Sequence, residues 1–153
     1  MISVTRITAD ADLERLAAEI NAATWDEAND IAEHDTSSLA AYLDRQDTVF
    51  VACHESVDGD RILLGTASAR LQIKPYETER WLYIDEVDVC ADQRRKGAGR
   101  AIMAELFDIA REAGCIEVWL GTEVDNDAAN GLYRSLDPTE REEFVGYAWT
   151  IAP

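Results

Sequence analysis

Residues 81–113 read WLYIDEVDVCADQRRKGAGRAIMAELFDIAREA, and the arrangement of the rest of the chain follows from them. The part up to Val89 is rich in β-branched and aromatic residues, which predicts a strand. From Gly99 to Ala113 the apolar residues recur every three or four positions, which predicts an amphipathic helix. A strand, a short glycine-containing loop and a helix in this order point backbone N–H groups and the positive end of the helix dipole at one place. The stretch therefore predicts a binding place for an anionic group.

The loop between this strand and this helix is a basic cluster in an acidic protein. Residues 94–100, Arg-Arg-Lys-Gly-Ala-Gly-Arg, lie in a chain with a formal net charge of -17, with 14 Lys and Arg against 31 Asp and Glu. Such a local reversal of charge favours an anionic ligand. Lys96 precedes the two glycines, and Ile102 stands where a GxGxxG loop needs glycine, so neither familiar nucleotide loop is matched. ATP and NAD are therefore disfavoured.

The segments on either side predict a mixed sheet. Strands at 48–53 and 62–71 flank an acidic, glycine-containing connection and predict an antiparallel hairpin. A strand at 115–121 and a helix at 127–135 follow the central helix, and this alternation predicts a parallel crossover. The prediction is completed by an opening strand at 2–7, helices from about residues 13 and 38, a substrate-facing segment at 24–35, and a closing strand at 144–151. The predicted class is α+β, in a single domain of residues 1–153 with helices on both faces of the sheet.

The amino-acid composition further limits which kind of protein this chain can be. A chain of 153 residues that is 47% hydrophobic can bury a core without disulfides or a metal. No apolar run approaches the roughly 20 residues that cross a bilayer, and the N-terminus lacks a secretory signal, so a cytoplasmic protein without membrane contact is predicted. The 3 cysteines and 2 histidines lack ligand spacing, which predicts no metal site. The acidity disfavours nucleic acid as a partner and serves either cationic substrates or adaptation to high salt.

A second pattern accompanies the basic loop. The loop reads Arg94-Arg95-Lys96-Gly97-Ala98-Gly99, and Asn126 is followed by Ala129 and then Leu132-Tyr133. On these patterns and the strand before the loop, the chain resembles the GNAT superfamily of acetyl-CoA dependent N-acetyltransferases over nearly its whole length. The resemblance implies a GNAT-like mixed, mostly antiparallel sheet with a splayed pair of parallel strands at the cofactor cleft. Residues 136–139, Leu-Asp-Pro-Thr, depart from the Leu-Gly-Phe turn that is usual in the family.

The same resemblance implies acetyl-CoA as the cosubstrate and indicates the residues that bind it. In the family the loop wraps the pyrophosphate, and late backbone groups of the preceding strand hydrogen-bond the pantetheine arm. The predicted cosubstrate-binding residues are Val87, Val89, Arg94, Arg95, Lys96, Gly97, Ala98, Gly99, Arg100 and Asn126.

Acetyl transfer to an amine needs a deprotonated nitrogen, a polarised thioester carbonyl and a proton for the leaving thiolate. The resemblance implies that Glu86, or Asp85 beside it, removes the amine proton. Because neighbouring strand residues face opposite ways, only one of the two is expected to point into the cleft, and Glu86 is preferred. Glu86 is equally compatible with a structural role, or with holding a substrate cation together with Asp88, on the same strand face. The backbone N–H near Val87 is expected to polarise the carbonyl, and Tyr133 resembles the family's general acid.

Several segments resemble the small aminoglycoside 3-N-acetyltransferases: residues 74–77, 82–84, 93–97 and 123–127, the last running into Leu132-Tyr133. An acidic cleft would suit such a polycation, since several ammonium groups can each find a carboxylate. Polyamines, other small amines, and the N-termini or lysines of proteins remain open as acceptors. A non-catalytic acyl-CoA sensing module is the alternative from another class, whereas a nucleic-acid mimic is disfavoured by the basic loop.

Aromatic residues concentrate in the late predicted strands. The family often pairs subunits through these strands, and Trp81, Trp119, Tyr147 and Trp149 could supply the interface of a homodimer. Packing in the core is the commoner place for tryptophan on a strand, so both interpretations stand.

Overall fold

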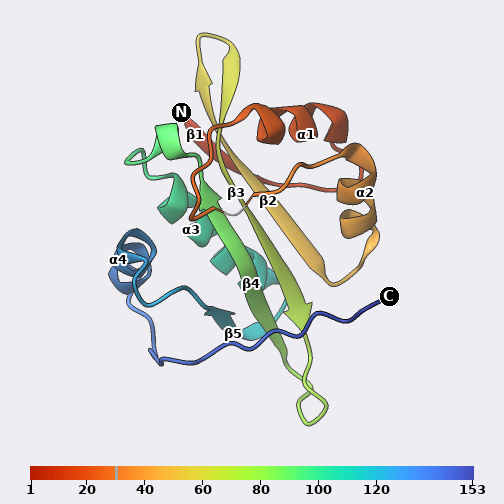
Figure 1. Ribbon diagram of the computed structural model, residues 1–153, viewed down its shortest axis with the longest axis vertical. Helices are drawn as coiled ribbons and strands as arrows, with labels where there is room; N and C mark the ends of the chain where they lie inside the picture. Colours follow the sequence, from red (N-terminus) through yellow and green to blue (C-terminus); the bar gives the residue numbers. More distant parts are fainter. Residues whose placement is uncertain (30) are drawn as a thin grey trace. The chain divides into compact units, whose positions relative to one another are not determined.

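The computed structural model describes residues 1–29 and 31–153, and the chain divides into two compact units, residues 1–121 and 122–153. Unit 1 contains a five-stranded sheet in the order β1-β2-β3-β4-β5 (Figure 1). The strands are β1 (Ile2–Arg6), β2 (Thr48–Val57), β3 (Asp60–Gln72), β4 (Arg80–Val89) and β5 (Cys115–Leu120). Neighbours pair antiparallel except β4 and β5, which are parallel. The predicted mixed, mostly antiparallel sheet is confirmed.

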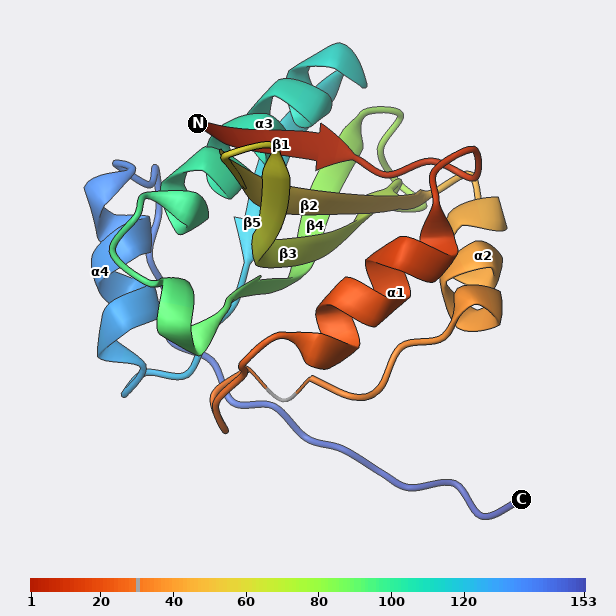
Figure 2. The same cartoon turned by 90° about the horizontal axis from the view of Figure 1, so that it is seen from above.

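Helices cover both faces of this sheet. They are α1 (Leu13–Ala22), α2 (Thr36–Asp44) and α3 (Ala98–Glu112), with a short 3-10 turn η1 (Ala91–Gln93) before α3. Figure 2 shows α1 and α2 on one side of the sheet and α3 on the other. Because α3 carries the chain across one face between β4 and β5, those two strands run in the same direction.

Each face has its own apolar layer, since alternate strand residues point to opposite sides. Beneath α1 and α2, Leu16 and Ile20 pack in one buried cluster with Leu39 of α2 and Phe50 of β2. On the other face, α3 contacts all five strands. Its buried stripe consists of Ala98, Ile102, Met103, Leu106, Ile109 and Ala110. The helical spacing seen in the sequence therefore corresponds to the face that is buried.

In unit 1, α1 and α2 begin at side chains that accept hydrogen bonds from the first turn. Asp12 accepts from the Arg15 N–H at 3.0 Å at the start of α1. Asp35 accepts from the Ser38 N–H at 2.7 Å at the start of α2, and the Ser38 hydroxyl lies 3.4 Å from the Asp35 N–H, completing a capping box. Such caps satisfy N–H groups that the helix itself leaves without acceptors.

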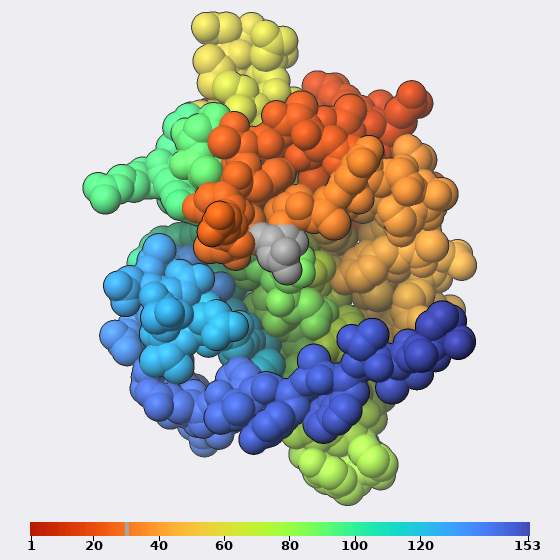
Figure 3. Space-filling model, in the orientation of Figure 1, coloured from red at the N-terminus to blue at the C-terminus, as the bar shows by residue number. Residues whose placement is uncertain are grey.

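The β2–β3 and β3–β4 connections, yellow and lime in Figure 3, project at opposite ends of the sheet. In the β2–β3 turn, Asp58 and Gly59 have φ of 51° and 89° and are closed by the pair Val57 and Asp60. Two left-handed residues of the type Asp-Gly make the tight turn that matches the twist of a hairpin. The predicted antiparallel hairpin is confirmed.

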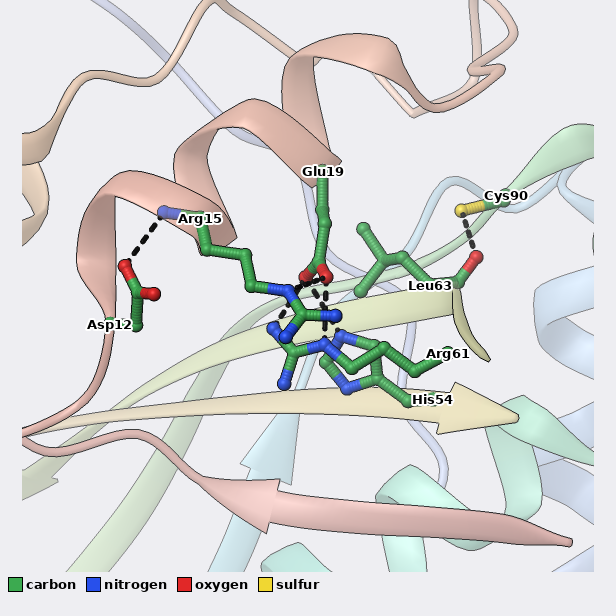
Figure 4. Close-up of polar contacts among 7 residues, drawn as sticks. All are labelled: Asp12, Arg15, Glu19, His54, Arg61, Leu63 and Cys90. Carbon is green, nitrogen blue, oxygen red and sulfur yellow. Dashed lines mark hydrogen bonds and ion pairs between the residues drawn. The ribbon is translucent and has the colours of Figure 1, made fainter. Parts of the chain in front are cut away.

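Glu19 attaches α1 to the strands beneath it (Figure 4). Its carboxylate accepts from Arg61 of β3, with Nε at 2.7 Å and Nη2 at 2.9 Å, and lies 3.0 Å from Nε2 of His54 on β2. Arg15, one turn earlier on α1, donates at 3.2 Å. Burial raises the pKa of Glu19, but the hydrogen bonds from Arg61 and His54 outweigh burial and leave the pKa below its usual value.

Glu19→Gln is expected to lower the free energy of unfolding by about 2 kcal/mol at pH 7, because Arg61 and His54 lose a charged acceptor. A carboxylate whose pKa is depressed by folding stabilises above its unfolded pKa, and that stabilisation is lost as the pH falls through the folded pKa. In urea unfolding between pH 7 and pH 3, the gap between wild type and variant should therefore shrink below the usual Glu value of about 4.5. A gap that stays constant to pH 3 would contradict the role given to Glu19.

Unit 2 consists of α4 (Asp127–Ser135) and the chain around it. The predicted closing strand at 144–151 is wrong, since residues 136–153 form neither helix nor strand. A strand requires a hydrogen-bonded neighbour, and no described strand pairs with this segment. Its apolar side chains, among them Val145, Tyr147 and Trp149, are exposed. An alternating pattern is therefore insufficient to make a strand here.

Cys53 and Cys90 are buried in unit 1, at 0% and 1% exposure, and burial raises the pKa of each thiol to about 11. Both are small residues of the core. No helix within the described ranges is long and apolar enough to cross a membrane. Apart from residue 30, the chain has no group of three or more His, Cys, Asp or Glu arranged to hold a metal ion.

Candidate active site

The predicted anion loop lies where η1 passes into α3. Gly97 is the N-cap of α3 with φ of 85°, a left-handed conformation that costs glycine little, and no side chain among the described residues caps the helix. The N–H groups of residues 98–100 also lack acceptors within the helix, as at every helix start. Arg95 has φ of 66°, so the loop turns sharply just before this point. An uncapped, glycine-led helix start with basic neighbours fits a diphosphate group.

Carboxylates from other parts of unit 1 already pair with two cations of this loop. Arg94 donates to Asp26, in the segment after α1, and Lys96 donates to Glu55 of β2 at 2.7 Å. The hydrogen bond from Arg94 is the main cause that lowers the pKa of Asp26, and the hydrogen bond from Lys96 does the same for Glu55. A phosphate that reaches Arg94 or Lys96 must therefore compete with these carboxylates.

β4 extends beyond its parallel neighbour. The pairing with β5 ends at Ile84 and Leu120, whereas β4 continues to Val89. From residue 85 to residue 89, the edge of β4 on the β5 side has no described strand beside it. This is the predicted splayed pair, and it leaves the backbone groups near Val87 and Val89 at an open strand edge. Such an edge can pair with an extended amide-containing ligand, so the pantetheine arm of acetyl-CoA fits.

A β-bulge interrupts β4 next to this open edge. Ser68 of β3 pairs with Glu86, and the next residue, Ala69, pairs with Ile84, so Asp85 is the extra residue of the bulge. A bulge places one additional residue in a strand and breaks the regular alternation of side chains.

The bulge brings both candidate bases to one face. Arg70 donates to both carboxylate oxygens of Asp85, at 2.9 and 2.8 Å. Arg70 and Ser68 are two residues apart on β3 and share a face, and Ser68 is the partner of Glu86. Asp85 and Glu86 therefore lie on the same side of the sheet. The expectation that only one of them could point to this side is wrong, because the bulge suspends the alternation.

Asp85 is engaged by a guanidinium and lies near a tyrosine hydroxyl. Both oxygens of Asp85 are used by Arg70, and this hydrogen bonding raises the pKa of Arg70. Tyr42 of α2 lies nearby, its hydroxyl 3.2 Å from the Val49 carbonyl oxygen and 3.1 Å from that of Ala69. Burial, followed by the negative charge of Asp85, raises the pKa of Tyr42. A base role for Asp85 would therefore require this ion pair to open, and the assignment of Glu86 as the base stays a prediction.

Aromatic side chains lie next to one another on β4 and β5, before the bulge in β4. Trp81 and Tyr83 of β4 stack at 6.0 Å between centroids, and Tyr83 lies 5.5 Å from Trp119 of β5. The Lys74 ammonium sits 3.5 Å from the centre of the Trp81 ring. Trp81 and Trp119 thus pack through Tyr83 within unit 1, and the homodimer stays a prediction.

One buried polar pair was not predicted from the sequence. Asn29 donates from Nδ2 to Asp88 Oδ1 at 3.0 Å, and the two residues are 8% and 6% exposed. Asp88 was considered as a substrate anchor beside Glu86, but its carboxylate is buried with Asn29. Asn29 lies in an acidic segment without periodicity, so no sequence signal marked it.

In unit 2, Asn126 and Tyr133 belong to α4. The Asn126 side chain accepts from the Ala129 N–H at 3.2 Å and caps the helix. Asn130 Nδ2 lies 2.9 to 3.3 Å from the carbonyl oxygens of Glu123, Val124 and Asn126. These contacts explain why α4 begins where the second sequence pattern starts. The cosubstrate role of Asn126 and the acid role of Tyr133 stay predictions.

The sheet ends in a splayed parallel pair, a glycine-led helix start lies beyond the longer strand, and carboxylates lie beside the open edge. This arrangement is the one expected of an acyltransferase dependent on coenzyme A. Comparison with protein families makes the class specific. The Acetyltransferase (GNAT) family matches residues 11–137, and the chain belongs to this family of N-acetyltransferases. The family implies acetyl-CoA as the cosubstrate.

A relative by sequence and several structurally similar proteins are aminoglycoside acetyltransferases. The chain is 28% identical over 139 residues to the aminoglycoside N(6')-acetyltransferase type 1 of Stenotrophomonas maltophilia, covering 89% of this chain and 86% of that protein. It superimposes with a TM-score of 0.79 on an aminoglycoside acetyltransferase from an uncultured soil metagenomic sample in complex with sisomicin, at 17% identity over 99% of this chain and 97% of that one. The ribosomal-protein-alanine N-acetyltransferase of Brucella melitensis biovar Abortus 2308 gives 0.70 at 18% identity, over 99% and 100%. The structural likenesses establish the fold.

Proposed function

We propose that the enzyme transfers the acetyl group of acetyl-CoA to a primary amine of an aminoglycoside, by direct attack of the amine on the thioester. The observation that carries the proposal is the stretch from residue 85 to residue 89 of β4, where an open strand edge coincides with three carboxylates on one face, those of Asp85, Glu86 and Asp88. The relative from Stenotrophomonas maltophilia, an aminoglycoside N(6')-acetyltransferase, supports the acceptor class. The acidic surface suits a polycationic acceptor.

Each step of the proposed acetyl transfer is assigned to a residue of this chain. Glu86 takes the proton of the acceptor ammonium, directly or through a water, so that the nitrogen lone pair can attack the carbonyl carbon. The β4 backbone N–H near Val87 polarises the carbonyl oxygen. As the N–C bond forms and the C–S bond breaks, Tyr133 gives its phenolic proton to the leaving thiolate. The extra proton on the acetylated nitrogen passes through water to the phenolate, which restores Tyr133, and Glu86 returns its proton to the solvent. Bound acetyl-CoA supplies the acetyl thioester, and Arg94 to Arg100 hold its pyrophosphate.

The position acetylated is the finer part of the proposal. The sequence resemblance implies the 3-amino group, whereas the 28% identical relative is named for the 6'-amino group. Both are primary amines on rings of the same class of polycation, so the same carboxylates serve either one. NMR of the purified product assigns the position directly.

The test is thiol release from acetyl-CoA with gentamicin-type aminoglycosides, polyamines and amino-terminal peptides, in low and in molar salt. Saturable release with an aminoglycoside is the expected result, with KM rising in salt if surface carboxylates attract the acceptor. Release only with peptides would replace the acceptor by a protein N-terminus. Tight coenzyme A binding without release for any amine would favour the sensing module. Unchanged turnover in Tyr133→Phe would instead remove Tyr133 as the general acid.

A further inference from the structure

The segment from residue 26 to residue 29 contacts both halves of the proposed site. At one end, Asp26 accepts from Arg94 of the anion loop. At the other end, Asn29 donates to Asp88 of β4, which pairs with Thr66 and so shares the face of Glu86. Figure 3 shows this orange segment beside the green anion loop.

Hydrogen bonds within the segment determine which side-chain atoms of Asp26 and Asn29 are available to residues outside it. The Ala28 N–H donates to Asp26 Oδ1 at 3.0 Å, which leaves Oδ2 for Arg94. The Asp26 N–H donates to Asn29 Oδ1 at 3.0 Å. The amide oxygen of Asn29 is thereby occupied, so its NH2 group faces Asp88. Hydrogen bonds therefore link Arg94, Asp26, Asn29 and Asp88 in this order, the middle one through the Asp26 backbone N–H.

Burial differs along this chain. The Arg94 and Asp26 side chains are 45% and 37% exposed, so water and ions reach their ion pair. Asn29 and Asp88 are buried. An exposed ion pair contributes little and is readily exchanged, whereas a buried hydrogen bond to a carboxylate is costly to break. The Arg94 end is thus the replaceable one.

We propose that Asp26 occupies Arg94 in place of a cosubstrate phosphate, and that Asn29 is a positioning residue that transmits the exchange to Asp88 on the catalytic strand. The inference rests on the pyrophosphate binding at Arg94, which is part of the proposed function. When a phosphate takes Arg94, the 26–29 turn keeps its internal hydrogen bonds but loses its hold on the anion loop, so the hydrogen bond from Asn29 to Asp88 is left to position the turn. Cosubstrate binding then changes the packing of the segment against the β4 carboxylates.

The chain offers a matched control. Lys96 and Glu55 form a second ion pair on the same loop, at 2.7 Å, but no described hydrogen bond links Glu55 to the 26–29 segment. Asp26→Asn and Glu55→Gln each remove one negative charge beside the loop. Asn at position 26 can still accept from the Ala28 N–H, so the turn is retained. Only Asp26→Asn removes the ion pair that joins the anion loop to the 26–29 segment.

The experiment measures coenzyme A binding by calorimetry and the Asn29 side-chain amide resonances by NMR, without acceptor or turnover. Both variants are expected to bind coenzyme A about 2- to 5-fold more tightly, because phosphate no longer competes with a carboxylate. In wild type and in Glu55→Gln, coenzyme A is expected to shift the Asn29 resonances. In Asp26→Asn, these resonances should already be shifted in the free protein and move little on binding.

The outcomes separate this inference from the proposed function. Tight coenzyme A binding with identical affinities and Asn29 shifts in wild type and Asp26→Asn would overturn the inference and leave the acetyltransferase intact. An equal loss of the Asn29 response in both variants would assign the effect to net charge and would also overturn it. If the wild type failed to bind coenzyme A, no cosubstrate phosphate would reach Arg94, and both proposals would be overturned.

Discussion

Glu86→Gln is expected to lower kcat/KM for the amine acceptor by about 100- to 1000-fold at neutral pH, the range for loss of a general base. Glutamine keeps the size and hydrogen-bonding reach of the side chain but cannot take a proton. The dissociation constant for coenzyme A should stay near the wild-type value, because the predicted contacts to the cosubstrate are backbone groups and the basic loop. Steady-state kinetics over pH 5–9 with calorimetry of coenzyme A test both statements, and the variant should lose the acidic limb of the pH profile.

Asp85→Asn is the matched control for that experiment. It removes one carboxylate from the neighbouring position, so the effect of net charge is the same. Asp85 pairs with Arg70, and the two side chains are 36% and 46% exposed, so the ion pair adds little to stability. We expect a loss in kcat/KM of less than about 10-fold, since Glu86 is the proposed base and Asp85 is engaged by Arg70. A larger loss for Asp85→Asn than for Glu86→Gln would reverse the two roles.

Gly65→Ala is expected to cost about 3 kcal/mol of unfolding free energy, at the upper end for overpacking. Gly65 pairs with Val89, and a Cβ at position 65 would lie 2.4 Å from the backbone oxygen of Asp88 and 3.2 Å from the Val89 Cα. Both obstacles are main chain, so no side chain can rotate away and β3 must separate from β4. Thermal unfolding should show a midpoint lower by about 6–12 °C. Activity should fall with it, because the displaced backbone is the open edge of β4.

Gly131→Ala provides the comparison for this stability measurement. Gly131 lies within α4, and a Cβ there would meet nothing within 4 Å. Alanine is favoured over glycine in a helix by up to about 1 kcal/mol, so the variant should be as stable as wild type or slightly more so. A wild-type unfolding midpoint for Gly65→Ala would show that the β3–β4 pair can relax, contrary to the argument from main-chain contacts.

The local elements of unit 1 could be predicted because each has a periodic signal. The stripe on α3 and the Asp-Gly turn both appear in the sequence as they do in the structure. The parallel β4–β5 pair followed from the helix between two strands. The closing strand at 144–151 failed, because a strand exists only with a neighbour and the alternating pattern does not supply one.

The site was predicted in part, for a similar reason. The residues of the anion loop are consecutive, so sequence order alone places Arg94 to Gly99 on one helix start. Asp85 and Glu86 are also adjacent, yet their relative direction was predicted wrongly, because the bulge depends on the register with β3. Asn29 was missed, since its partner Asp88 is 59 residues away.

The sequence by itself determined the class of the fold and the place of the anion loop, because helical periodicity, glycine positions and charge act within a few residues. The tertiary structure alone decided which carboxylates share a face, which cations of the loop are already paired, and which segment joins the loop to β4. These features depend on strand register and on contacts between distant residues, and no local pattern encodes them. The proposed binding of phosphate at Arg94 and the proposed proton transfer at Glu86 therefore depend on partners that only folding brings together.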